Sequence, residues 1–330
     1  MNHQNVYTAE EEFEHLQDAV ARNGLDLQVV LPENKDTILH RMRFHYLDWN
    51  AHRKTPMVLL HGGALTAHTW DVVSLAFRPE YHCLALDQRG HGDSEWSPEM
   101  EYSRSAQVWD LECFVAEMGI DKFILVGMSM GGLNSLQYAG KHSDRLWGLV
   151  IVDVGPDLHI EGARKITDFT SQFTELPSIE AFVERAMKFN PRRDPALLRR
   201  SLVNNLRQLP DGRWTWKYDQ RHRVTWDLEQ MKQEQAELWK DIPHIGCPTL
   251  IVRGAQSQVL FDEDAARLAD ALPNGRWVRI ENAGHTVQGD NPKDLIGAMR
   301  NFFSEIEVGE GTKPNASSMR GELERRDAGT

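Results

Sequence analysis

The sequence contains few cysteines, and its charge balance leaves no excess of basic side chains for binding nucleic acid. Only Cys83, Cys113 and Cys247 occur in 330 residues. Their number is odd and their spacing matches no metal motif, so we expect buried, reduced thiols. Lysine and arginine number 37 against 49 aspartates and glutamates, and the net charge is −12. Because phosphates would be repelled without a compensating basic patch, we expect no nucleic-acid partner.

The sequence also shows no long apolar run and no pattern typical of a targeting leader. No stretch has the roughly 20 consecutive apolar residues of a membrane-spanning helix. The first residues, Met1 to Glu12, contain no basic segment followed by an apolar one, which is the pattern of a signal peptide. We therefore expect a soluble cytoplasmic protein without a membrane partner.

A serine between two glycines is the feature around which the rest of the sequence can be organised. Residues 123–126 form an apolar run, typical of a strand buried on both faces, and Ser129 follows closely. From Met130 onward the pattern is helical, so Ser129 is expected on a tight strand-to-helix turn, for which Gly127 and Gly131 leave room. The backbone N–H of Met130 would then face a negative charge forming beside the serine.

Strand and helix patterns alternate through most of the chain. A short amphipathic helix is predicted over 8–23, followed by two strands over 27–31 and 40–49. Buried runs then end in glycine-rich or acidic loops, with helical patterns between them, which indicates βαβ units and a parallel sheet. His61 and His91 lie in two of these loops, but they lack metal-ligand spacing, so we expect no metal site there.

From about residue 157 to residue 242 the strand pattern stops. Helices are predicted over 160–175, 178–190 and 194–209, as an insertion over the carboxyl-terminal edge of the sheet. Trp214, Trp216 and Trp226 either line a pocket or pack the insertion onto the core, and the sequence leaves both interpretations open. The sheet resumes after 243, and residues 307–330 are polar and charged, so we expect a disordered tail.

Four motifs in order resemble those of the α/β-hydrolase family with a helical cap. They are His61-Gly62-Gly63, the segment from Asp87 to Ser94, Gly127-Met-Ser129-Met-Gly131, and Gly284-His285. The resemblance implies an α/β fold with a mostly parallel, eight-stranded sheet flanked by helices. It implies a core made of residues 26–156 and 243–306 and a cap over 157–242. Residues 1–25, which lie before the part that the resemblance covers, are expected to form an N-terminal helical extension.

The same resemblance assigns chemical roles to individual residues. It makes Ser129 the nucleophile and His285 its general base, and it places the backbone N–H groups of Gly63 and Met130 in an oxyanion hole. A serine hydroxyl is a weak nucleophile until an imidazole takes its proton, and two N–H donors stabilise the oxyanion that forms. His61 resembles the histidine that holds the oxyanion loop in this family.

The acid of the expected triad is where the sequence departs from the common family pattern. The usual aspartate position, in the loop after Gly254, contains only alanine, serine, glutamine and apolar residues. Asp153, at the end of the preceding predicted strand, is the leading candidate, and its alternative role is to cap the following Gly-Pro turn. Asp262 and Asp264 are rivals, although their position suits the capping of a helix.

The resemblance implies a serine hydrolase that cleaves a carboxylic ester or a lactone through an acyl-serine. A carbon–carbon bond hydrolase acting on a diketone-like substrate is the alternative, and a ligand receptor built on the same fold is a third possibility. A small-molecule ester or lactone is the expected partner. No metal or organic cofactor is implied, and the sequence does not indicate the oligomeric state.

Overall fold

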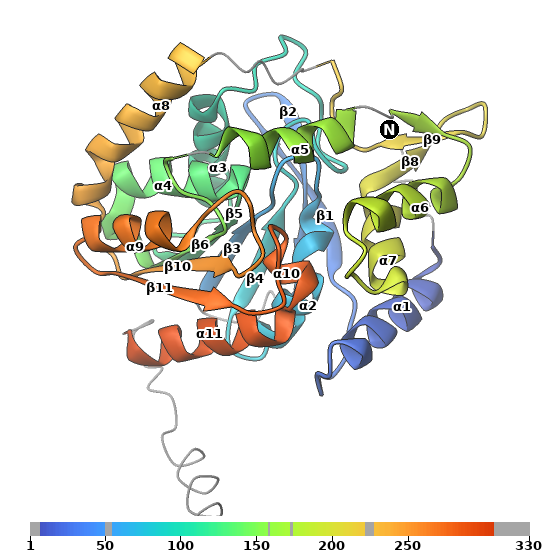
Figure 1. The fold of residues 1–330 in the computed structure, drawn as a ribbon, viewed down its shortest axis with the longest axis horizontal. Coiled ribbons are helices and arrows are strands. Elements are labelled where there is room, and N and C mark those ends of the chain that lie inside the picture. The colour runs from blue at the N-terminus through green and yellow to red at the C-terminus, as the bar shows by residue number, and fades with distance from the viewer. Residues whose placement is uncertain (1–6, 50–54, 158, 172–173, 222–227, 307–330) are drawn as a thin grey trace, which may run out of the picture.

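An eight-stranded sheet forms the centre of the protein (Figure 1). The computed structural model describes residues 7–49, 55–157, 159–171, 174–221 and 228–306. Along the sheet the strands run in the order β1-β2-β4-β3-β5-β6-β10-β11. Their bounds are β1 Glu33–Leu39, β2 Met42–Asp48, β3 Pro56–Leu60, β4 His82–Leu86, β5 Phe123–Met128, β6 Leu146–Val152, β10 Thr249–Gly254 and β11 Gly275–Ile280.

The pairing confirms the predicted, mostly parallel sheet. Strands β3, β4, β5, β6, β10 and β11 pair in parallel, whereas β2 pairs antiparallel with both β1 and β4. The strand predicted over 27–31 is wrong, because this apolar segment packs against the core without entering the sheet. The edge strand is instead the polar β1, which can be mostly exposed because it has a neighbour on one side only.

Helices cover both faces of the sheet and bury its alternating side chains. Met57 and Leu59 of β3 face one layer, and Val58 and Leu60 face the other, as the two-residue period of a strand requires. The first layer consists of α1 Ala9–Arg22, α2 Asp71–Phe77 and α11 Pro292–Glu305. The second contains α3 Arg104–Glu117, α4 Met130–His142 and α9 Asp262–Ala271.

Between β6 and β10 the chain forms an insertion with a small sheet of its own. Its elements are α5 Ile160–Ser171, β7 Glu175–Leu176, α6 Ile179–Phe189, α7 Pro195–Asn205, β8 Leu206–Gln208, β9 Trp214–Trp216 and α8 Leu228–Asp241. The prediction of a purely helical segment therefore needs correction, because β7, β9 and β8 pair antiparallel. The helix predicted over 194–209 ends at Asn205, and the Gly212 turn, with φ +87°, joins β8 to β9.

The predicted N-terminal helix is confirmed as α1, which begins after a Thr8–Glu11 capping box. It packs beside α2 of the core and α7 of the insertion (Figure 1). Two polar contacts join this N-terminal segment to the insertion: Arg22 at the end of α1 pairs with Asp194 at 3.1 Å, and Tyr7, just before α1, accepts from Arg199 at 2.5 Å. The helix therefore links the insertion to the core.

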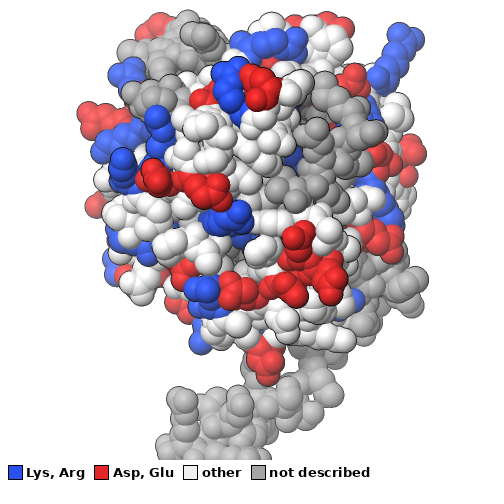
Figure 2. Space-filling view, turned by 90° about the vertical axis from the view of Figure 1, so that its right-hand side faces the viewer, with Lys and Arg blue, Asp and Glu red and all other residues white. Residues whose placement is uncertain are grey.

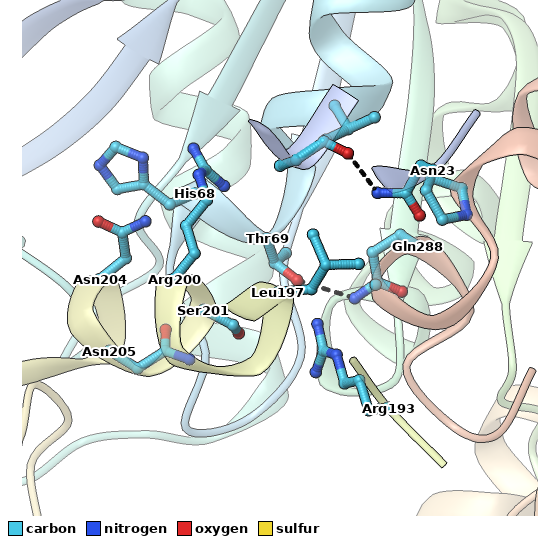
Figure 3. Close-up of a pocket in the computed structure, with 14 residues that line it drawn as sticks. Asn23, His68, Thr69, Arg193, Leu197, Arg200, Ser201, Asn204, Asn205 and Gln288 are labelled. Atoms are coloured by element: carbon cyan, nitrogen blue, oxygen red, sulfur yellow. Dashed lines mark hydrogen bonds between the residues drawn. The ribbon is translucent and has the colours of Figure 1, made fainter. Parts of the chain in front are cut away.

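The insertion side of the molecule carries basic and acidic side chains interspersed with each other (Figure 2). A small cavity lies between α1, α7 and two short helical segments of the core, η1 Ala67–Trp70 and α10 Val287–Asp290 (Figure 3). Among the described residues, no helix combines the length and the apolar character needed to cross a bilayer. Trp226 and the tail predicted over 307–330 lie outside the described residues.

Candidate functional site

Ser129 lies on the predicted sharp turn between β5 and α4. Its backbone has φ 52° and ψ −118°, a conformation that residues other than glycine rarely adopt. A Cβ atom at Gly131 would lie 2.4 Å from the Leu60 carbonyl oxygen, and one at Gly127 would lie 2.3 Å from the Gly131 carbonyl oxygen. Glycine at both positions therefore allows the helix to start directly against β3 and β5, which fixes the serine at the edge of the sheet.

Ser129, His285 and Asp153 meet at the carboxyl-terminal edge of the sheet. The Ser129 Oγ lies 2.9 Å from His285 Nε2, and His285 Nδ1 lies 2.8 Å from Asp153 Oδ2. Because an ionised carboxylate can only accept, Nδ1 of the ring donates to it, and Nε2 of the neutral ring accepts from the serine hydroxyl. The three side chains follow β5, β6 and β11, and they form one continuous hydrogen-bonded chain.

Asp153 is fully buried, and three donors surround its carboxylate. Besides His285, the Gly254 N–H donates to Oδ1 at 2.8 Å and the Ser257 hydroxyl donates to Oδ2. Such donors are needed because burying a carboxylate without hydrogen bonds is costly. Sequence reasoning considered this loop only as a place for an acid, and it missed Gly254 and Ser257 as donors to an acid from another strand.

The two rival acids have other partners. Asp262 and Asp264 stand in the first turn of α9. The Asp262 carboxylate lies 3.1 Å from Arg253 Nε, and the Asp264 carboxylate lies 2.6 Å from His159 Nε2. Both ring nitrogens of His285 are already within hydrogen-bonding distance of Asp153 and Ser129. The geometry therefore favours Asp153 as the partner of the histidine.

His61 holds the loop after β3 in place. Its Nδ1 donates to the Gly62 carbonyl at 2.8 Å, and its Nε2 accepts from the Gln88 N–H at 3.0 Å. Burial lowers the pKa of His61, which keeps the ring neutral so that one nitrogen donates and the other accepts. The His61 carbonyl accepts from the Gly131 N–H at 3.1 Å, so the loop is joined directly to the helix that follows Ser129.

This loop brings Gly62, the neighbour of Gly63, to the side of Ser129. A Cβ atom at the neighbouring Gly62 would lie 3.2 Å from the Ser129 Cβ, whereas one at Gly63 would meet nothing within 4 Å. Met130 is the first residue of α4, where a helix leaves its N–H groups without internal partners. Within the described ranges, no protein group accepts from the Gly63 or the Met130 N–H.

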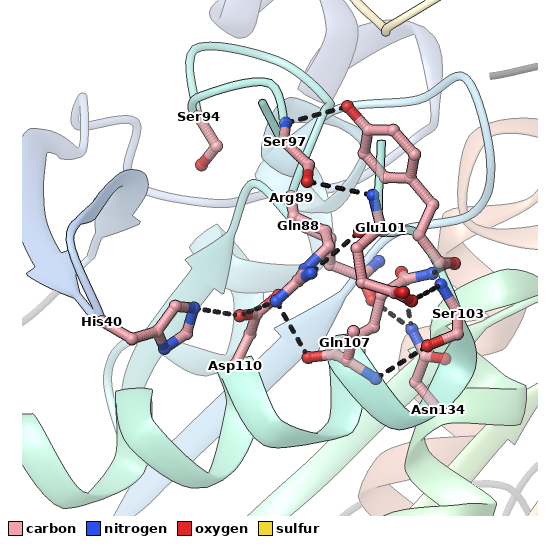
Figure 4. A network of polar contacts seen from close by, with 12 residues as sticks. His40, Gln88, Arg89, Ser94, Ser97, Glu101, Ser103, Gln107, Asp110 and Asn134 are labelled. Atoms are coloured by element: carbon pink, nitrogen blue, oxygen red, sulfur yellow. Dashed lines mark hydrogen bonds and ion pairs between the residues drawn. The ribbon is translucent and has the colours of Figure 1, made fainter. Parts of the chain in front are cut away.

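The loop after β3 is also bonded to a network of polar side chains that includes Gln88, Gln107 and Asn134 (Figure 4). The Gln88 side chain donates to the His61 carbonyl at 2.6 Å, and Asn134 donates to Gln88 at 2.7 Å and to Gln107 at 3.0 Å. These residues come from the loop after β4, from α4 and from α3. The network therefore connects the loop after β3 to two helices of the second layer.

The neighbouring Arg89 and Asp110 form a buried ion pair in the same network (Figure 4). Arg89 donates through Nε and Nη2 to the two Asp110 oxygens at 2.5 and 2.6 Å, and its Nη1 donates to the Glu101 carbonyl at 2.8 Å. The two side chains are 4% and 3% exposed. Because the guanidinium is almost fully buried, the Asp110 carboxylate compensates for the solvation that it loses.

One group of residues in the described ranges has donor atoms close enough to suggest a metal site: His45, Asp87 and Asp93. Asp87 accepts from His45 Nδ1 at 2.8 Å, from the Ala67 N–H at 2.6 Å and from the Asp93 N–H at 3.0 Å. Asp93 is paired with Lys217 of the insertion at 3.0 Å. These protein donors already satisfy the carboxylates, so the group fits a structural role better than a cation.

The predicted aromatic residues occupy different positions. Trp216 is 3% exposed and packs against Phe182 in the core of the insertion, with ring centroids 5.0 Å apart. Trp214 is half-buried at the border of that core, on the same strand. The position of Trp216 matches the packing interpretation of these residues.

A matched pair of glycine variants tests the crowding at the turn. Gly131→Ala should destabilise the protein by more than about 3 kcal/mol, because its Cβ would overlap a backbone oxygen that cannot move freely. Gly297→Ala in α11 is the control, since a Cβ atom added at Gly297 would meet no other atom within 4 Å outside the helix's own backbone. That change should be neutral or stabilise by up to about 1 kcal/mol. Urea unfolding measures both, and equal stability of the two variants would contradict the prediction.

The buried ion pair gives a second stability prediction. Asp110→Ala should destabilise by about 3–5 kcal/mol, because it leaves Arg89 charged and buried without its partner. Asp211→Ala removes the same side chain from an exposed pair with Arg213 and should leave the unfolding midpoint close to that of the parent. Urea unfolding followed by circular dichroism compares the two, and similar midpoints would show that the buried pair contributes little.

Known proteins resemble this chain in sequence and in fold. The family model for the alpha/beta hydrolase fold matches residues 55–292. The esterase Rv0045c of Mycobacterium tuberculosis is 34% identical over 251 residues, covering 74% of this chain and 81% of that protein. A crystal structure of Rv0045c matches with a TM-score of 0.72, at 31% identity, over 89% of this chain and 98% of that one.

Two further relatives cover most of the chain. The 3-hydroxybutyrate-oligomer hydrolase of Cupriavidus necator is 28% identical over 276 residues, which cover 80% of this chain and 93% of that protein. The esterase YbfF of Escherichia coli is 26% identical over 264 residues, which cover 78% and 96% respectively. With the sheet order and the turn at Ser129, these similarities show that the chain belongs to the α/β-hydrolase fold family.

Proposed function

We propose that the protein is a serine esterase that hydrolyses carboxylic esters or lactones through an acyl-serine. The observation that supports this most directly is the continuous hydrogen-bonded chain from Ser129 through His285 to Asp153. A serine, an imidazole and a buried carboxylate in this order are the parts needed to activate a hydroxyl nucleophile. The similarity to proteins named as esterases supports the same reaction class.

In the proposed acylation step, His285 Nε2 takes the proton of the Ser129 hydroxyl while Oγ attacks the carbonyl carbon of the ester. The carbonyl π electrons move to the oxygen, and the resulting oxyanion faces the N–H groups of Gly63 and Met130. Asp153 holds the ring orientation and stabilises the imidazolium. When the intermediate collapses, the bond to the alcohol breaks and Nε2 returns its proton to the leaving alkoxide.

Deacylation repeats these steps with water in place of the serine. His285 takes a proton from the water, whose oxygen attacks the acyl carbon, and the collapse of the second intermediate releases the acid and restores the Ser129 hydroxyl. The same site could host carbon–carbon bond hydrolysis of a diketone-like substrate. Product analysis separates the two reactions, since an alcohol is released only from an ester.

Removal of the nucleophile is the first test. Ser129→Ala should lower kcat for aryl ester hydrolysis by a factor on the order of 10⁴ or more, because no acyl-enzyme can form. The parent and the variant are assayed on phenyl esters and lactones of graded acyl size. Comparable rates for the two proteins would show that Ser129 is not the nucleophile, and no turnover by the parent would favour carbon–carbon hydrolysis or ligand sensing.

The identity of the acid is tested by two aspartate variants. Asp153→Asn should lower kcat by about 10³–10⁴-fold, because a carboxamide cannot stabilise the imidazolium and favours the wrong tautomer of His285. Asp262→Asn is the matched control, since Asp262 pairs with arginines at the start of α9, and its kcat should stay within a few-fold of the parent value. The opposite ranking of the two variants would assign the acid to the later loop.

A further inference from the structure

The cavity between α1, α7, η1 and α10 has an unusual lining for a protein with this charge. Fourteen residues line it, and they include three basic side chains and six neutral polar ones but no aspartate or glutamate. In the whole sequence acidic residues outnumber lysine and arginine by 49 to 37. The cavity therefore presents hydrogen-bond donors where the average surface of this protein would present carboxylates.

Arg193, in the segment before α7, provides the first cation. Its guanidinium points into the cavity from the side of Gln288 (Figure 3). Its nearest carboxylate is Asp290, with 3.8 Å between Nε and Oδ1, which is too long for a hydrogen bond. Within the described residues its buried Nε has no hydrogen-bond partner. A buried guanidinium with unused donors is costly unless an anion accepts from it.

Arg200 of α7 and His68 of η1 lie together on another side of the cavity (Figure 3). They share the single carboxylate of Asp71, with Arg200 Nη2 at 2.5 Å and His68 Nδ1 at 3.0 Å from the same oxygen. Burial alone would lower the pKa of His68, but the Asp71 carboxylate outweighs it and raises that pKa. When His68 is protonated, two cations share the Asp71 carboxylate, and Glu12 is a further negative charge that acts on His68.

The cavity also borders the two segments that complete the proposed active site. Gln288 and Gly289 lie on α10, which begins two residues after His285, and Thr69 lies on η1, which follows the Gly63 loop. Gln288 donates to the Thr69 hydroxyl at 2.9 Å, which joins these two segments. An anion in the cavity would therefore sit beside the loops that hold the general base and the oxyanion donors.

We propose that this cavity binds a small anionic group, a carboxylate or a phosphate, between Arg193 on one side and Arg200 with His68 on the other. Its volume of about 40 Å³ has room for a few heavy atoms and excludes an aromatic ring. The anionic group could belong to either of two ligands. One is the charged end of an acidic ester substrate, and this choice rests on the proposed esterase function; the other is a free anion.

Isothermal titration calorimetry of the full chain with sodium acetate and sodium phosphate tests the site itself. The parent should bind at least one of them saturably. Arg193→Met should weaken that binding by about tenfold or more, because a charge-assisted hydrogen bond is lost. Asn204→Leu should weaken it as well by filling the cavity while every charge is kept. Arg213→Met, which removes a half-exposed cation from the same insertion, should bind like the parent.

The inference is overturned if neither anion binds saturably, or if Arg193→Met and Asn204→Leu both bind like the parent. Thermal unfolding of each variant shows whether it is folded. If Arg193→Met does not fold, Asn204→Leu alone tests the site. Because these titrations need no turnover, their result is independent of whether the protein is an esterase.

A kinetic comparison distinguishes the two sources. Phenyl hemiesters of succinate, glutarate and adipate are compared with phenyl butyrate, pentanoate and hexanoate, which have the same acyl lengths without the charge. If the substrate supplies the anion, kcat/KM should favour the charged ester at one chain length by about tenfold or more, and Arg193→Met should abolish that preference. Binding of acetate or phosphate without any such preference assigns the cavity to a free anion. No turnover of any ester would contradict the esterase proposal alone.

Discussion

The contact between the His285 ring and the Asp153 carboxylate has to cross a strand. Asp153 follows β6 and His285 follows β11, and β10 lies between these strands in the sheet. β10 ends in Gly254, where a Cβ atom would lie 2.1 Å from the Gly284 carbonyl oxygen. Because Gly254 has no side chain, the loop that contains Gly284 and His285 can pack directly against the end of β10. The Gly254 N–H donates to Asp153. The geometry of the site depends on this close approach of three strand ends.

In the proposed triad, the same constraint explains why the acid, Asp153, can stand one strand earlier than in the common family pattern. A carboxylate after β6 is fully buried, so it needs donors from its surroundings. The loop after β10 supplies two of them, the Gly254 N–H and the Ser257 hydroxyl, in the place where an aspartate is usual in the family. In the proposed triad, this loop therefore donates hydrogen bonds to the acid, Asp153, and does not supply the acid itself. The loop after β3, on the other side of Ser129, is held in a similar way, by the neutral His61 ring and the Gln88 side chain.

Much of this was predictable because the signals are local. The apolar run before Ser129, the flanking glycines and the Gly284-His285 pair lie within short stretches of sequence, and the structure brings Ser129, His285 and Asp153 together as the prediction requires. The small sheet of the insertion was missed because strands of two or three residues contain too few positions to show a two-residue period. The mostly apolar segment 27–31 resembles a strand in sequence. Its apolar side chains pack against the core although the segment does not pair with the sheet. The support of Asp153 by Ser257, and the cavity around Arg193, combine segments about a hundred or more residues apart, so no local pattern could indicate them.

The central claim is that Ser129 becomes acylated during turnover. Rapid quenching of the parent protein with excess phenyl butyrate, followed by proteolysis and peptide mass spectrometry, measures this directly. The account predicts a butyryl group on the peptide that contains Ser129, which accumulates when deacylation is slow and disappears once the substrate is exhausted. Ester turnover with the butyryl group on another residue would contradict the account.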